Sequence, residues 1–199
     1  MVLKVFFSWQ SETEQQGFNN KSFLIECLNS SLNAIANKGS LKGVTFEFIE
    51  GMGGEAGHPD VAGKMFENAD NCDIFVGDLT VVNKLGSIAK FLSWCHISRS
   101  FQRKTQNSNV LIELSRVLGR SETFEEQIVL VMNTINGDPE KYPECIPFDL
   151  RGRRWPITFL LKDKNDKGSS WKKAKTALKK VLPEALRLAA VKAIEHKRG

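Results

Sequence analysis

Two patterns of hydrophobic and polar positions alternate along this chain. Short, almost continuous apolar runs are typical of strands that lie buried in a parallel sheet. They cover residues 3–8, 44–49, 72–78, 127–133 and 157–161. Between them, apolar residues recur every three or four positions, which predicts helices near residues 20–37, 59–69 and 107–119 and from about 169 onward. This alternation predicts one open α/β domain with a five-stranded, mostly parallel sheet flanked by helices.

The carboxyl ends of strands one and three are where we expect a ligand to bind. Open parallel sheets bind ligands at strand ends near the point where the strand order reverses, and in a 2-1-3-4-5 order strands one and three flank that point. They end at Ser8-Trp9 and at Asp78-Leu79-Thr80. The glycine-dense loop 51–60 and the helix that carries Glu113 should open at the same edge.

Composition bounds the class of protein. At 199 residues and 41% hydrophobic, the chain can bury one good core. The sequence begins with a strand pattern and contains no apolar run long enough for a membrane span, so we expect a cytoplasmic protein. The four cysteines and three histidines are scattered without ligand spacing. We therefore expect reduced thiols and no metal site.

Positive charge is concentrated in the tail. Residues 162–198 hold twelve Lys and Arg against four Asp and Glu, a balance of +8. The rest of the chain therefore has a net charge of −3, and the whole chain has +5. We expect residues 1–161 to form the body and residues 162–199 to form a basic helical extension packed on it, with Pro183 as a break or the start of a second helix. The apolar residues that should pack against the sheet are Trp171, Ala174, Leu178, Val181 and Leu182. The lysines lack interleaved aromatic residues, so binding of nucleic acid is the less favoured interpretation.

Glu113 is the main candidate for chemistry. It sits among apolar neighbours in the helix 107–119, which Ser108 or Asn109 should cap. A carboxylate there either reaches solvent as a helix-start glutamate or lines a pocket. One carboxylate over a nucleotide-sized cleft suits cleavage of an N-glycosidic bond, because it can oppose the positive charge of an oxocarbenium-like transition state. Asp78 either hydrogen-bonds a ribose hydroxyl or caps the turn after its strand.

Six short motifs occur in order and together resemble the bacterial TIR-like domains of antiphage defence. The resemblance covers residues 3–161. The motifs are Lys4-Val-Phe-Phe-Ser-Trp-Gln-Ser11, Asn19-Asn-Lys-Ser-Phe-Leu-Ile25, Gly57-His-Pro-Asp-Val61, Asp73-Ile-Phe-Val-Gly-Asp-Leu-Thr80, Asn109-Val-Leu-Ile-Glu-Leu114 and Ile146-Pro-Phe-Asp-Leu-Arg151.

The resemblance implies a flavodoxin-like fold and cleavage of NAD+ as a substrate, with no further cofactor. The catalytic glutamate of that family falls on Glu113. Substrate-binding positions are then expected in the first-strand loop, in the loop after strand two, after strand three and at the start of the Glu113 helix. These positions are Phe7, Ser8, Trp9, Gly53, Gly54, His58, Asp78 and Asn109. We also expect self-association through TIR–TIR contacts, and a trigger that comes from a sensor or effector protein or from that self-association.

Two other classes of function stay open. One is a silent interaction module that only assembles, and the other is an enzyme similar to nucleoside deoxyribosyltransferases, which also uses one glutamate in such a sheet. Residues 79–107 form an insert with five Lys and Arg and no Asp or Glu. Its apolar face either packs on its own domain or serves as a lid or assembly surface beside the cleft.

Overall fold

The protein forms a flavodoxin-like α/β fold around a parallel five-stranded sheet. The computed structural model describes residues 1–10, 19–51, 60–82, 105–151, 155–162 and 168–198. In these ranges the strand order is β2-β1-β3-β4-β5, and every strand pair is parallel. The strands are β1 (Val2–Ser8), β2 (Thr45–Glu50), β3 (Ile74–Asp78), β4 (Ile128–Asn133) and β5 (Ile157–Phe159). The predicted fold class and strand order are confirmed.

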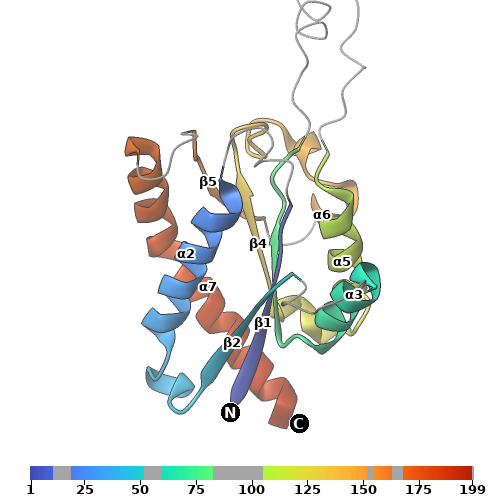
Figure 1. The fold of residues 1–199 in the computed structure, drawn as a ribbon, viewed down its shortest axis with the longest axis vertical. Coiled ribbons are helices and arrows are strands. Elements are labelled where there is room, and N and C mark those ends of the chain that lie inside the picture. The colour runs from blue at the N-terminus through green and yellow to red at the C-terminus, as the bar shows by residue number, and fades with distance from the viewer. Residues whose placement is uncertain (11–18, 52–59, 83–104, 152–154, 163–167, 199) are drawn as a thin grey trace, which may run out of the picture.

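Helices cover both faces of the sheet (Figure 1). Helices α2 (Asn20–Ile35) and α7 (Ser169–Arg198) lie on one face, and α3 (Val61–Asn71) and α5 (Ser108–Leu118) lie on the other. The shorter helices are η1 (Gly39–Leu41), η2 (Glu122–Gln127), η3 (Pro143–Cys145) and α6 (Phe148–Arg151). The predicted strands and the first three predicted helices end within two residues of the observed limits.

Alternation along the strands divides the core into two layers. Phe7 packs on the α2 and α7 side, whereas Phe6 packs on the α3 and α5 side. Phe6 meets Phe75 edge to face at a centroid distance of 5.8 Å. On the other side, Phe23 of α2 meets the Trp171 ring of α7 at 4.9 Å. Successive residues at a strand end therefore point to opposite faces of the sheet.

The tail is one helix of 30 residues, and the prediction of a break at Pro183 is wrong. Pro183 removes one backbone donor. Leu182 and Leu186, on either side of it, are fully buried, so packing on the body holds the helix together through the proline. Trp171 and Leu178 are buried as predicted, but Val181 is 48% exposed and does not belong to the contact.

The two ends of the described chain lie together at the amino-terminal edge of the sheet (Figure 1). Lys197 donates to Val2 O at 3.2 Å and to the Asp73 carboxylate at 2.8 Å. The terminal amine of Met1 donates to Gly43 O at 3.0 Å. None of the helices in the described ranges has the length and apolarity that crossing a membrane requires.

Candidate functional site

Glu113 lies on the face of α5 that packs against the sheet. It shares that face with Val110, Leu114 and Val117, which are buried. The glutamate itself is only 4% exposed, although a charged side chain is rarely buried without a partner. On the exposed side of the helix, the Arg116 guanidinium donates two hydrogen bonds to the Asp70 carboxylate of α3, each with an N–O distance of 2.6 Å. The solvent-exposed helix-start interpretation of Glu113 therefore does not fit its position.

Asn107, rather than Ser108 or Asn109, caps α5. Its backbone is extended, so its side-chain oxygen folds over the helix start and accepts from Asn109 N at 2.8 Å and from Val110 N at 3.2 Å. The side chain of Asn109 is exposed on the first turn. The cap fixes the start of the helix, and with it the orientation of the turn that carries Glu113.

Ser8 ends β1 and faces Glu113. Burial raises the pKa of Glu113 above its ordinary value, and interaction with the Ser8 hydroxyl opposes part of that rise. The two groups do not reach full hydrogen-bond geometry, since Ser8 Oγ is buried and has no hydrogen-bond partner among the described residues. The result is a hydroxyl and a carboxyl group, both shielded from water, at the carboxyl edge of the sheet.

Asp78 ends β3 and lies on the opposite face of the sheet from Ser8. Its Oδ1 accepts from the backbone N–H of Thr80 at 3.0 Å and from the Thr80 hydroxyl. Burial raises the pKa of Asp78 to about 6, against the lowering effect of those bonds. Its Oδ2 is buried and accepts no hydrogen bond of full geometry in the described part of the chain, although the Asn20 side chain also lowers the pKa of Asp78. Asp78 is thus both a turn former, as one prediction held, and a carboxylate with an unused oxygen.

A buried polar network surrounds Asp78, and sequence reasoning missed it. Asn20 Nδ2 donates to Thr80 Oγ1 at 3.1 Å, and Asn133 Nδ2 donates to Asn20 Oδ1 at 2.8 Å. Asn133 also exchanges hydrogen bonds with the backbone of Leu161. These contacts tie the start of α2 to the ends of β3, β4 and β5. The available signal was the polar residue that ends three of the strands, namely Ser8 in β1, Asp78 in β3 and Asn133 in β4.

The other predicted first-strand residues do not join Glu113. Phe7 is fully buried in the core, 6.2 Å from the Phe48 ring between centroids. Trp9 is half-buried, with the Lys21 ammonium 3.9 Å from its ring centroid. Of Phe7, Ser8 and Trp9, only Ser8 interacts with the candidate carboxylate. Gly53, Gly54 and His58 lie outside the described residues.

The two ends of the insert meet at this edge. Val82 N donates to Thr105 O at 2.9 Å, so the chain leaves and re-enters the described structure at neighbouring points. Gln106, the next residue, donates to Cys145 O and is buried. Residues 83–104, on which the lid or assembly hypothesis rests, lie outside the described residues.

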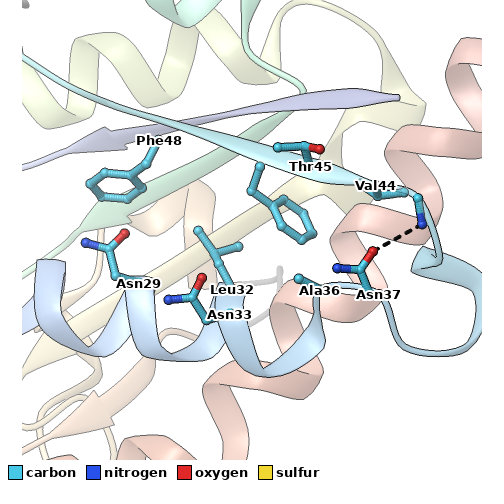
Figure 2. A pocket seen from close by; sticks show the side chains of 10 residues that line it. Asn29, Leu32, Asn33, Ala36, Asn37, Val44, Thr45 and Phe48 are labelled. Atoms are coloured by element: carbon cyan, nitrogen blue, oxygen red, sulfur yellow. Dashed lines mark hydrogen bonds between the residues drawn. The ribbon is translucent and has the colours of Figure 1, made fainter.

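A cavity of about 280 Å³ lies elsewhere, between α2 and β2 (Figure 2). Asn29, Leu32 and Asn33 of α2 face the Phe48 side of it. Asn37 closes one end by accepting from Gly43 N at 3.3 Å. Glu113 and Asp78 are not among the lining residues. This cavity is therefore separate from the edge that carries the two buried carboxyl groups.

Within the described ranges, no group of three or more His, Cys, Asp and Glu side chains is placed to hold a metal ion. Cys27 and Cys72 are buried and unpaired, and burial raises the pKa of each thiol to about 12, which leaves both thiols protonated at neutral pH. The candidate site is thus the polar edge formed by Ser8, Asp78 and Glu113. No known protein-family model matches this chain, and no curated protein matches it.

Proposed function

We propose that the protein cleaves the N-glycosidic bond of NAD+ as a TIR-like enzyme, with Glu113 as the catalytic carboxylate. The observation that carries the proposal is the buried Glu113 carboxyl facing the Ser8 hydroxyl at the carboxyl edge between β1 and β3. The motifs that resemble TIR-like domains add to it, since the family's catalytic glutamate falls on this position. The fold alone would not suffice, because flavodoxin-like sheets host many chemistries.

Electrostatics give the carboxylate its role. When the bond between ribose C1′ and the pyridinium nitrogen breaks, its electron pair goes to nicotinamide and positive charge grows on the ribosyl group. An ionised Glu113 opposes that charge, and its shielding from water makes the attraction stronger than it would be at the surface. Water, or an internal nucleophile of the same molecule in the case of a cyclic product, then forms a bond to ribose C1′ and loses a proton.

Ser8 suits a positioning role beside Glu113. Its hydroxyl can donate one hydrogen bond to the carboxylate and accept another from a substrate hydroxyl. Its backbone is held in the sheet opposite Gly77 of β3, so the hydroxyl is presented from a rigid strand. Ser8→Ala should therefore lower kcat/KM less than Glu113→Gln does.

The test is to incubate the purified protein with NAD+ and, separately, with pairs of deoxynucleosides and free bases, and to separate the products. We expect nicotinamide together with ADP-ribose or its cyclic form. Exchanged deoxynucleosides would instead indicate a deoxyribosyltransferase-like enzyme, and absence of any product would favour the interaction module.

Variants then assign the carboxylate. Glu113→Gln keeps the shape and removes the charge, so it should lose at least 100-fold in activity. Its melting temperature should stay within a few degrees of the parent value. Glu47→Gln, the same change at an exposed strand residue, is the matched control and should remain active. Full activity of Glu113→Gln would rule out the assigned role.

A further inference from the structure

Two buried acceptor oxygens near the end of β3 accept no hydrogen bond of full geometry from the described residues, although the Asn20 side chain lies near enough to Asp78 to lower its pKa. They are Asp78 Oδ2 and Gln10 Oε1. Both side chains are anchored on one residue, because Thr80 donates to Asp78 Oδ1 and its carbonyl accepts from Gln10 Nε2 at 3.1 Å. That second bond also fixes which end of the Gln10 amide is the oxygen. Buried acceptors without donors are rare in folded proteins and are costly.

The chemistry of the missing group follows from the two atoms. An amide oxygen and an ionised carboxylate oxygen accept hydrogen bonds and donate none. No Lys or Arg among the described residues contributes to the electrostatics of Asp78. A group that satisfies both atoms must therefore bring two donors and must not be an anion.

We infer that Gln10 and Asp78 form a subsite for the carboxamide NH₂ of the nicotinamide leaving group. This inference rests on the proposed function and adds the feature by which the substrate is selected. The NH₂ group supplies two N–H donors from one nitrogen. Asp78 ends β3, and Glu113 of α5 faces Ser8 at the end of the neighbouring strand β1, on the other face of the sheet. The inference places the ring at Asp78 and the ribosyl carbon toward Glu113.

The subsite predicts that the protein distinguishes NAD+ from analogues that differ only in the carboxamide of the leaving group. Nicotinic acid adenine dinucleotide carries a carboxylate in place of the carboxamide, so it offers no donors and is repelled by Asp78. The 3-acetylpyridine analogue of NAD+ replaces NH₂ by a methyl group of similar size and keeps both ribose hydroxyls. The parent protein should cleave NAD+ with a kcat/KM at least tenfold above that of either analogue.

Asp78→Asn should change this selectivity in a defined direction. Its amide places a donor where the carboxylate had an acceptor, which suits the acid substrate and opposes the carboxamide. The ratio of kcat/KM for NAD+ over the acid dinucleotide should fall at least tenfold. Asp73→Asn, the same change directly before the first residue of β3, is the control and should leave the ratio unchanged. An unchanged ratio in folded Asp78→Asn would overturn the inference.

The analogue results separate the inference from the proposed function. If NAD+ is cleaved and the acetyl analogue is cleaved equally well, the two oxygens hold a water or a ribose diol, and the carboxamide subsite is wrong. If no dinucleotide is cleaved, the proposed function fails, and thermal shifts with free nicotinamide and free nicotinate decide the subsite. A rise in Tm with nicotinamide alone would support it. Equal shifts, or none, would overturn it.

Discussion

Replacing Asp78 by asparagine should stabilise the protein at neutral pH, because burial makes the ionised carboxylate unfavourable in the folded state. Its folded pKa of about 6 lies above the ordinary 3.8. This difference already includes the hydrogen bonds from Thr80 and the contribution of the Asn20 side chain, which favour the ionised form. Two pKa units correspond to about 3 kcal/mol at a pH where the group is ionised in both states. The asparagine keeps an acceptor for Thr80 and carries no charge.

The sign and pH window follow from linkage. The raised pKa means that the folded protein binds the Asp78 proton more tightly than the unfolded chain does. Binding of this proton therefore stabilises the folded state fully below about pH 4, and the stabilisation is lost as the pH rises through about 6. Asparagine does not titrate. The variant should therefore match the parent near pH 4 and exceed it by roughly 1–3 kcal/mol at pH 7–8.

Urea unfolding at several pH values measures this difference directly. The free energy of unfolding should be determined for both proteins between pH 4.5 and 8, with slopes compared to confirm the same unfolding transition. Glu113 titrates in both proteins, so its effect cancels in the comparison. Asp73→Asn should have the opposite sign, because it removes the negative charge that pairs with the Lys197 ammonium and keeps only one acceptor oxygen for Lys4 N and Lys197. A difference for Asp78→Asn that is zero or negative at pH 7, or constant with pH, would refute the reasoning.

Three further predictions concern Glu113, the cap and the tail. The ionised form of Glu113 should be the active one, so kcat/KM for NAD+ should rise with pH through a pKa above the ordinary 4.5, and an acid-side rate equal to the plateau would contradict this. Asn107→Ala removes the cap of α5 and should lower the free energy of unfolding by about 1 kcal/mol in urea titrations; no loss would show that solvent replaces the cap. Leu178→Ala should cost about 2–5 kcal/mol, and truncation after Gly168 should abolish cooperative unfolding. A truncated protein that unfolds normally but loses binding to DNA or anionic vesicles would instead make the tail an electrostatic element.

The positions of the strands and of the Glu113 helix could be predicted because each depends on local pattern, and the strand order could be predicted from the general rules of open α/β sheets. Apolar runs marked the strands, and the spacing of Val110, Leu114 and Val117 marked the helix. The sequence left open whether Glu113 reaches solvent or lines a pocket, and the structure places it on the buried face. The interruption at Pro183 was predicted from the same local rules and is wrong. Leu182 and Leu186 pack on the body from both sides of the proline, and that packing outweighs the missing hydrogen bond.

The polar network could not be predicted, since its members meet only in three dimensions. Asn20 and Asn133 are 113 positions apart, and neither has an unusual sequence neighbourhood. The sequence also grouped Ser8 with Asp78, whereas strand alternation turns them to opposite faces of the sheet. Gln10 was missed because only its bond to the Thr80 carbonyl places its amide beside the end of β3.

The shared location of the chain ends decides how the protein can be attached to other molecules. Helix α7 is about 45 Å long and runs back along the body to end beside Val2, at the edge of the sheet opposite Glu113. If either end of the chain is attached to a solid support, the edge of the sheet that carries Glu113 therefore still faces solvent. The terminal amine already binds Gly43 O, so an affinity tag placed before Met1 would disturb a native contact. Immobilisation through residues after Arg198 is the better design for binding measurements.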